Sequence, residues 1–343
     1  MAPHVAPVLF VNAGAERGGA EVVLLALLRH LDRDRFPPHV CCLRDGPFVE
    51  ELRRGAGVDV TVIPAGGFRQ VASGLSAVRR LRALIAHTRA ALVHGNGMGA
   101  HLYGGLAARL SGVPNLYHVH DVPERGWNAQ GLLTRVARLV PAAAAVTPSR
   151  FLAERVARRP VRSARILHIP NGLDALDLPR VPTEESAGGR APVAIWCGRL
   201  QRWKGAHVFL RAAAIARRSV PNARFIVVGG SLMGLEPEYH AELRSLVASL
   251  DLGPAVRFAG HQASVAPFLA EADVVVHSAI APEPFGLVIL EAMLAARPVV
   301  ASAEGGPLEI VEPEVTGVLV PPGDAGALAA ALVRLFGDTD LRA

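Results

Sequence analysis

The chain is poor in aromatic residues, in cysteine and above all in lysine. Aromatic residues make up 5% of its 343 residues, which leaves little material for an aromatic platform that stacks on nucleic acid bases. There are 3 cysteines, Cys41, Cys42 and Cys197, an odd number with two members adjacent in sequence. Because adjacent cysteines rarely bridge, we expect buried, reduced thiols rather than a disulfide framework, as in the cytoplasm.

Long uncharged apolar runs are also missing. A membrane-spanning helix needs about 20 apolar residues, and the nearest candidate, 139–146, is short and contains Pro141. Residues 1–7 are too few for a secretion signal before the first expected strand. We therefore expect a cytoplasmic protein, with peripheral contact at the inner membrane face as an alternative.

Charge is divided unequally along the chain. Residues 1–170 contain 22 Arg and 11 acidic residues, a balance of +11, whereas 171–343 contain 14 basic and 19 acidic residues, a balance of −5. The first half could meet a phosphorylated acceptor, an anionic membrane surface or the acidic second half. Alternatively, Arg-rich helix faces only keep the protein in solution. No nucleic acid partner is expected, since no known binding motif is present.

Apolar strand-like runs alternate with helix-like periodicity along most of the chain, which predicts an α/β fold with parallel sheets. The expected strands are 8–12, 40–43, 58–63, 92–94, 116–120, 143–147, 193–196, 225–229, 256–259, 274–277, 299–301 and 317–320, and the segment 166–170 leads into a turn at Asn171-Gly172. The expected helices are 20–31, 75–88, 101–110, 132–139, 151–158, 205–218, 239–250, 286–295 and 325–336.

A stretch rich in Pro and Gly interrupts this alternation. We place an N-terminal Rossmann-like domain at 1–170, a linker at 171–190 and a C-terminal Rossmann-like domain at 191–343. Two such domains would face each other across a central cleft, and ligands would bind beyond the carboxyl ends of the strands.

The strongest candidate site contains Arg199 and Lys204, directly after the first strand of the second domain. Cationic side chains, backbone amides and a helix N-terminus would converge there on a diphosphate. A compact ammonium at this single position, in a chain that otherwise uses Arg, favours a specific contact. The alternatives are a surface lysine and a structural Arg salt bridge.

A second candidate site is the segment from Glu283 through Pro284, Phe285, Gly286 and Leu287 to Glu291. If Pro284 begins a helix, the following amides would face an anion. Eight helical residues rise about 12 Å, so Glu283 and Glu291 could bind hydroxyls at opposite ends of one nucleotide sugar. Alternatively, Glu283 is a helix-capping charge and Glu291 a solvated helix residue.

Weaker signals lie in the first domain and near the C-terminus. Gly18 and Gly19 end a strand-to-helix loop whose amides could approach a ligand, or form an ordinary turn. His118 and His120 share one strand face beside Asp121, which fits a charge-stabilising site, a thin metal site or a structural histidine. A Gly-rich turn, Gly305-Gly306, precedes Glu309, which we expect on the following helix.

Together these elements resemble family 4 of the glycosyltransferases, a retaining group with the two-domain GT-B fold. The resemblance covers almost the whole chain. It is carried by Gly18-Gly19-Ala20-Glu21, His120-Asp121, Thr147-Pro148-Ser149, Ile169-Pro170-Asn171-Gly172-Leu173-Asp174, Gly198-Arg199-Leu200, Lys204-Gly205, Glu283-Pro284-Phe285-Gly286, Glu291, Gly305-Gly306, Glu309 and Thr316-Gly317.

The resemblance implies a role for each donor-side residue. Arg199 and Lys204 would hold the diphosphate of a UDP- or GDP-sugar, and Glu291 would bind the ribose hydroxyls. Glu283 would bind hydroxyls of the donor sugar, helped by the backbone at Phe285, Gly286 and Leu287.

In the first domain, the Gly18-Gly19 turn would touch the phosphate through Gly19, and His120 would sit near the anomeric carbon. The implied activity is retaining transfer of a hexose-type sugar by front-face substitution, with neither a metal nor a cofactor. The alternatives are a non-catalytic nucleotide-sugar-binding protein and a GT-B-fold UDP-sugar epimerase.

The acceptor cannot be named from the sequence, and we expect its site in the first domain around 66–74, 95–99 and 121–130. Members of the family usually continue into a helix that crosses back onto the first domain. This chain ends at Leu341-Arg342-Ala343, so we expect that crossover helix to be missing.

Overall fold

The computed structural model describes residues 5–66, 71–122, 135–158, 163–174, 190–231 and 236–342. They divide into two compact units, Met1–Gly172 and Leu173–Ala343. Most of the predicted linker at 171–190 lies outside the described residues, as does the start of the predicted helix at 132–139.

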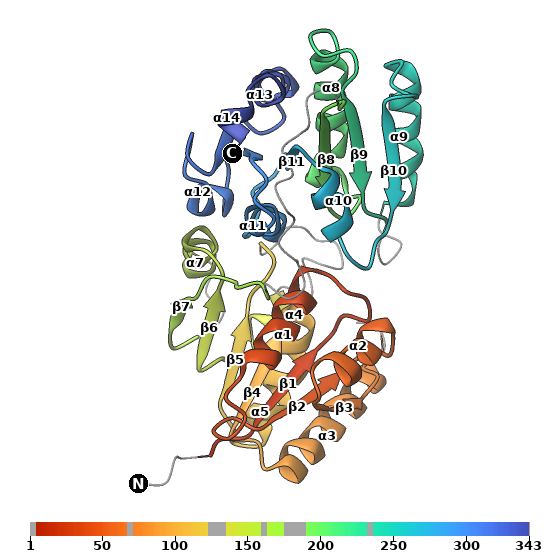
Figure 1. Ribbon diagram of the computed structural model, residues 1–343. Helices are drawn as coiled ribbons and strands as arrows, with labels where there is room; N and C mark the ends of the chain where they lie inside the picture. The colour runs from red at the N-terminus through yellow and green to blue at the C-terminus, as the bar shows by residue number, and fades with distance from the viewer. Residues whose placement is uncertain are drawn as a thin grey trace. The chain divides into compact units, whose positions relative to one another are not determined.

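In its described residues, unit 1 has one seven-stranded parallel sheet in the order β3-β2-β1-β4-β5-β6-β7 (Figure 1). The order reverses between β1 and β4, and in parallel sheets the position beyond the carboxyl ends of two such strands is the usual ligand-binding crevice. All residues of β1 are buried, as expected for a sheet covered on both faces. The strands are β1 (Val8–Asn12), β2 (Pro38–Cys42), β3 (Asp59–Val62), β4 (Leu92–Asn96), β5 (Asn115–His118), β6 (Ala144–Thr147) and β7 (Ile166–His168).

Alternate residues of β1 point into two separate cores of unit 1. Val8 and Phe10 pack with α1 (Gly19–His30) and α2 (Pro47–Gly55). Leu9 and Val11 pack with α3 (Val71–Thr88) and α5 (Leu106–Leu110). Unit 1 also contains α4 (Met98–Ala100), the π-helical turn η1 (His101–Gly105) and α7 (Arg150–Ala157).

Unit 2 repeats this plan with six parallel strands in its described residues, in the order β10-β9-β8-β11-β12-β13. Here the order reverses between β8 and β11, which defines the second crevice. The strands are β8 (Val193–Cys197), β9 (Arg224–Val228), β10 (Val256–Gly260), β11 (Val274–His277), β12 (Val299–Ser302) and β13 (Gly317–Val320).

Helices also cover both faces of the unit 2 sheet. Helices α8 (Ala206–Ala216), α9 (Pro237–Ser249) and α13 (Ala325–Gly337) bury one face, and α10 (Ala266–Glu271) and α11 (Leu287–Leu294) bury the other. Four alanines of α8 are fully buried, and α8 packs directly on α13. The shorter helices are η3 (Arg202–Lys204), α12 (Pro307–Ile310) and α14 (Thr339–Arg342).

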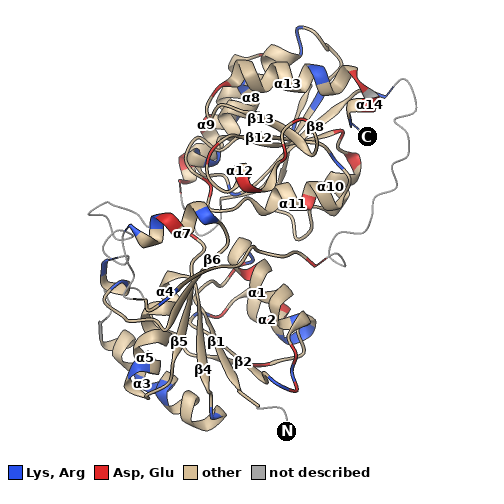
Figure 2. Cartoon of the chain, turned by 90° about the vertical axis from the view of Figure 1, so that its left-hand side faces the viewer, with Lys and Arg blue, Asp and Glu red and all other residues tan. Residues whose placement is uncertain are grey.

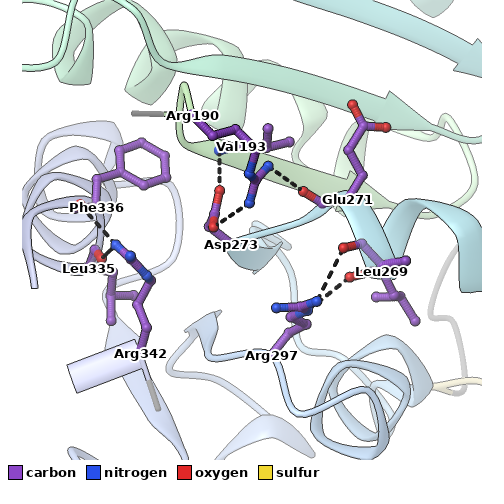
Figure 3. A network of polar contacts seen from close by, with 10 residues as sticks. Arg190, Val193, Leu269, Glu271, Asp273, Arg297, Leu335, Phe336 and Arg342 are labelled. Carbon is purple, nitrogen blue, oxygen red and sulfur yellow. Dashed lines mark hydrogen bonds and ion pairs between the residues drawn. The ribbon is translucent and has the colours of Figure 1, made fainter. Parts of the chain in front are cut away.

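Hydrogen bonds to the Asp273 carboxylate fix the beginning of β8 (Figure 3). The buried carboxylate of Asp273 accepts hydrogen bonds from the Val193 amide and the Arg190 guanidinium, each over 2.7 Å. Nearby, Arg297 donates to the carbonyl oxygens of Leu269 and Ala270 at the end of α10. Charge-assisted bonds of this kind hold β8 in register, so the residues that follow β8 start from a rigid position.

The structure corrects several predicted elements. Helices α2 and α10 were not predicted, although α2 has Pro47 at its first position and buries Phe48, Val49 and Leu52. Strand β5 ends at His118 rather than at 120, so His120 lies beyond the strand. Helix α11 begins at Leu287, and Pro284 therefore precedes the helix instead of opening it. None of the helices in the described ranges is both long and apolar enough to cross a membrane.

Candidate functional site

In unit 2, three side chains meet at the crevice between β8 and β11. The Lys204 ammonium lies 2.5 Å from Oε2 of Glu283, and Nε2 of His277 lies 3.1 Å from the same oxygen. Since the carboxylate can only accept, His277 donates its Nε2 proton to it. Oε1 of Glu283 accepts no hydrogen bond within the described residues, so this oxygen is left for a ligand hydroxyl.

The charge of Glu283 depends on these two neighbours. The Glu283 side chain is 8% exposed, and burial alone would raise its pKa. The Lys204 ammonium and the His277 hydrogen bond outweigh that effect and lower the pKa of Glu283 to about 2. Glu283 is therefore ionised at neutral pH despite its burial.

The two loops that carry Lys204 and Glu283 are fastened together by backbone contacts. Gly205 adopts φ +75°, and a Cβ atom there would lie 1.8 Å from the Ser278 carbonyl oxygen. The Ser278 hydroxyl donates to the Gly205 carbonyl over 2.8 Å, and the Ile280 amide donates to the Trp203 carbonyl over 2.8 Å. Only glycine permits this approach, and it sets the distance between the two loops.

The Gly305-Gly306 turn supports Glu283 from the other side. The Gly306 amide donates to the Glu283 carbonyl over 2.8 Å. A Cβ atom at Gly305 would lie 2.3 Å from that carbonyl oxygen, and one at Gly306 would lie 2.4 Å from Cα of Phe285. The Gly-rich turn thus holds the Glu283 backbone in place, while Glu309 lies on α12 as expected.

The beginning of α11 has the properties of an anion site. Gly286 is its N-cap with φ +104°, and the amides of Phe285, Gly286 and Leu287 form no hydrogen bond within the described residues. Unpaired amides at a helix start favour an anion. Glu283 lies before α11, whereas Glu291 lies on it. The prediction that one helix carries both carboxylates, about 12 Å apart, was therefore wrong.

The remaining predicted residues of unit 2 lie at the end of β8. Arg199 is half-buried, and its guanidinium forms no ion pair or hydrogen bond with any described residue. The predicted alternative of a structural salt bridge is therefore not seen there. Burial raises the pKa of the Cys197 thiol, and the charge of Glu291 raises it further, which places that carboxylate near the end of β8.

Unit 1 has its own polar cluster at the crevice between β1 and β4. Asn12 ends β1, Asn96 ends β4, and both side chains are buried. Nδ2 of Asn96 donates to Oδ1 of Asn12 over 2.9 Å, and Oδ1 of Asn96 lies 2.7 Å from Nε2 of His120. This contact holds His120 in place although it lies past the end of β5.

The predicted glycine pair begins α1 beside the same cluster. Gly18 is the N-cap of α1, Gly19 is its first residue, and Glu21 reaches back to the Gly18 amide over 3.2 Å. Burial raises the pKa of Glu21, and the charge of Asp121 adds to that effect. A Cβ atom at Gly14 would lie 2.0 Å from Oε1 of Glu21, so the loop before the helix closes tightly over the carboxylate.

Three histidines lie together in this cluster. The ring centroids of His118 and His120 are 4.1 Å apart, and Nε2 of His94 lies 3.3 Å from Nδ1 of His118. Burial lowers the pKa of His120 well below its ordinary value, and His118 and His94 lower it further. No group of His, Cys, Asp and Glu suited to a metal ion occurs in the described part of the chain.

Sequence reasoning missed three functional candidates, Asn12 as a side chain, Asn96 and His277. Each is a polar residue that ends an otherwise apolar strand, in VLFVN, LVHGN and VVVH respectively. A polar residue at the end of an apolar strand can be recognised in the sequence. It indicates a binding site only once the strand order shows that the strand borders a crevice. Residues 67–70 and 123–130 of the predicted acceptor region lie outside the described residues.

Two Rossmann-like units with parallel sheets define the GT-B class of fold, and solved structures agree. Anabaena HepE in complex with UDP and glucose matches with a TM-score of 0.84 and 29% identity, over 98% of this chain and 91% of that one. Sucrose-phosphate synthase from Thermosynechococcus elongatus matches with a TM-score of 0.79 at 22% identity over 98% of this chain and 91% of that one, which shows the fold alone.

Sequence comparisons identify the family. The model "Glycosyltransferase Family 4" matches residues 17–175, and "Glycosyl transferases group 1" matches residues 191–338. A D-inositol 3-phosphate glycosyltransferase of Thermobispora bispora is 32% identical over 383 residues, which cover 98% of this chain and 86% of that protein. The chain belongs to family 4 of the glycosyltransferases.

Other relatives match over shorter stretches. The D-inositol 3-phosphate glycosyltransferase of Salinispora arenicola is 40% identical over 160 residues, which cover 45% of this chain and 35% of that protein. The match thus spans about a third of that relative's length.

Proposed function

We propose that the chain is a retaining glycosyltransferase that moves a hexose-type sugar from a UDP- or GDP-sugar to an acceptor, without a metal ion or cofactor. The observation that carries the proposal is the cluster of Lys204, Glu283 and His277 beside the unpaired amides that begin α11. A cation, free amides and an open carboxylate oxygen within one unit match the diphosphate and the sugar hydroxyls of such a donor.

Lys204 and Arg199 bind the diphosphate in this proposal. An ammonium carries three N–H donors, of which Glu283 takes one. The centroid of the Trp203 ring lies 4.2 Å from Nζ of Lys204, a cation–π contact that stabilises the ammonium. The guanidinium of Arg199 is unpaired within the described residues and supplies a second cation.

The donor's hydroxyls are assigned to carboxylates. Oε1 of Glu283 accepts from the donor sugar, and the amides at Phe285, Gly286 and Leu287 bind nearby oxygens. Glu291, near the end of β8, accepts from the ribose. From unit 1, Gly19 of the Gly18-Gly19 turn would present its amide to the phosphate, since the Gly18 amide is bonded to Glu21, and His120 would meet the sugar.

The reaction follows from these roles. The bond between the anomeric carbon and the phosphate oxygen breaks while the acceptor oxygen attacks from the same face. The leaving phosphate takes the acceptor's proton and departs as a nucleoside diphosphate. Lys204, Arg199 and the start of α11 stabilise its growing negative charge, so catalysis consists of positioning and electrostatics, and no metal is required.

The acceptor side is proposed to meet an anion. Arg residues lie on α3, α5 and α7 of unit 1 (Figure 2). Arg79, Arg80 and Arg82 of α3 are exposed, and Leu75 on the same helix is 65% exposed. An anionic acceptor, or the anionic inner surface of a membrane, fits such a face.

Thermal unfolding with added nucleotides tests the donor site. The parent chain and Lys204→Ala are heated in EDTA with UDP, GDP, ADP and their common sugars. A ligand at about 100 times its Kd adds roughly 2.7 kcal/mol, a readable shift. We expect one nucleotide to stabilise the parent, as HepE crystallised with UDP suggests, and the shift to vanish in Lys204→Ala.

Arg218→Ala is the matched control, because it removes one exposed cation past the opposite end of α8 and should keep the shift. A parent shift that survives Lys204→Ala would contradict the assignment of Lys204. If a nucleotide sugar binds but His120→Ala changes nothing, a non-catalytic binding protein is the better reading. Interconversion of the donor sugar without transfer would instead favour an epimerase.

A further inference from the structure

The hydrogen bonds around Asn96 determine which nitrogen of His120 carries its proton. Nδ2 of Asn96 lies 3.1 Å from the carbonyl oxygen of Ala20, and a backbone carbonyl can only accept. The group facing Ala20 must therefore be the amide NH₂ of Asn96. The opposite atom, which faces His120, is then the oxygen Oδ1.

The next residue in the chain of hydrogen bonds supports the same orientation. Nδ2 of Asn12 donates to the Gly14 carbonyl over 3.0 Å, so Oδ1 of Asn12 faces Asn96. The two N–H groups of Asn96 therefore donate to two oxygens, Oδ1 of Asn12 and the carbonyl oxygen of Ala20. Reversing the Asn96 amide would put oxygen against oxygen at both contacts.

His120 must complete this arrangement as a donor. Its Nε2 lies 2.7 Å from Oδ1 of Asn96, a short hydrogen bond in which only the imidazole can supply the proton. The neighbouring rings of His94 and His118 and the burial of the site disfavour a second proton on the imidazole. Nδ1 consequently carries a lone pair, and no described residue donates to it.

We propose that Asn96, braced by Asn12 and Ala20, is a positioning residue that fixes His120 as the neutral Nε2–H tautomer and presents Nδ1 as a hydrogen-bond acceptor. The functional part of this inference rests on the proposed function, because the group that binds Nδ1 would be a hydroxyl of the donor sugar. That group must bring a hydrogen, as a hydroxyl does and an ionised carboxylate does not.

The position of Asn12 and Asn96 in the fold explains why they can hold His120 in one orientation. They end β1 and β4, the neighbouring strands between which the sheet order reverses, and their side chains meet although 84 residues separate them. Both are buried at 3% exposure or less, so the hydrogen bond between them is shielded from water. Because every polar atom of the Asn96 side chain has a partner, its amide is held in a single orientation.

Nuclear magnetic resonance of the full ¹⁵N-labelled chain tests the proposal without any nucleotide. Two-bond ¹H–¹⁵N spectra at neutral pH report the tautomer, and His120→Gln assigns the signals. We expect one neutral state protonated on Nε2, with a slowly exchanging Nε2–H resonance. In Asn96→Ala that resonance should disappear and both tautomers should be populated.

Asn115→Ala is the control, because it removes another buried asparagine of unit 1 that contacts His101 rather than His120. It should leave the His120 resonance unchanged. In Asn96→Asp, the carboxylate should stabilise the imidazolium, so the pKa of His120 should rise, as direct contact between side chain 96 and the ring requires.

A proton on Nδ1 in the parent, or a tautomer and resonance unaffected by Asn96→Ala, would overturn the proposal. The parent spectrum, assigned with His120→Gln, decides even if the Asn96 variants do not fold. Because no donor is added, failure here is distinct from failure of the thermal test of nucleotide binding.

Discussion

Lys204 and Glu283 are 79 residues apart in sequence, and their charged groups lie 2.5 Å apart in the crevice of unit 2. Their side chains are 19% and 8% exposed, so the pair is largely withdrawn from water. The chain's only lysine thus keeps a buried carboxylate ionised while its remaining donors stay available to a ligand.

Removing one partner of this pair should destabilise the protein strongly. Lys204→Ala leaves Glu283 buried with only His277, and such changes cost about 3–5 kcal/mol. The double variant Lys204→Met/Glu283→Gln removes both charges and should recover a large part of that loss. Urea unfolding of the single and double variants measures the coupling. A cost below about 1 kcal/mol for the single variant, typical of surface pairs, would argue against a buried pair.

Glu283 should also produce an acid-dependent loss of stability. Its pKa is about 2 in the folded chain, below the ordinary 4.5, so folding favours the ionised form. The stabilisation is therefore fully present above pH 4.5 and is lost as the pH falls from 4.5 toward 2. Glu283→Gln should flatten the unfolding free energy in this range. An unchanged pH profile in that variant would assign the acid sensitivity to other groups.

Gly205→Ala should separate the two loops of the donor site. The new methyl group would meet the Ser278 carbonyl oxygen at 1.8 Å, in a backbone conformation that alanine disfavours. Gly260→Ala is the control, with φ +71° in the same unit but no atom within 4 Å of the added carbon. We expect Gly260→Ala to lose about 1 kcal/mol and Gly205→Ala considerably more, together with the nucleotide-dependent thermal shift. Equal losses would mean that the close approach to Ser278 is unimportant.

The Arg-rich face of unit 1, formed by Arg79, Arg80 and Arg82 of α3, should bind anionic vesicles in a salt-sensitive manner. Each Arg near an anionic surface contributes about 1 kcal/mol, and salt screens that attraction. In co-sedimentation, the chain should pellet with anionic vesicles at low salt but not with neutral ones. Arg79→Glu/Arg82→Glu should abolish the effect, whereas Arg218→Glu in unit 2 should not. Equal sedimentation with both vesicle types would remove the membrane from the proposal.

Most strands could be predicted from the sequence because buried parallel strands are short, nearly continuous apolar runs. β1, β11 and β13 have the predicted boundaries, and most others differ by one or two residues. Helices α2 and α10 were missed because they are short and their periodicity covers only two or three turns. The end of β5 was misplaced because Val119 and His120 continue its alternation, while the Asn96 contact holds His120 outside the strand.

The sequence by itself determined the α/β class, the division into two Rossmann-like halves and the candidate residues that follow the strands. Apolar periodicity, Gly-rich turns and a single lysine are local features, and they can be read without knowing what lies beside them. Only the tertiary structure decided which of these residues meet. Strand order brings Asn12 to Asn96 and Lys204 to Glu283, because parallel strands joined by helices become neighbours across long stretches of chain.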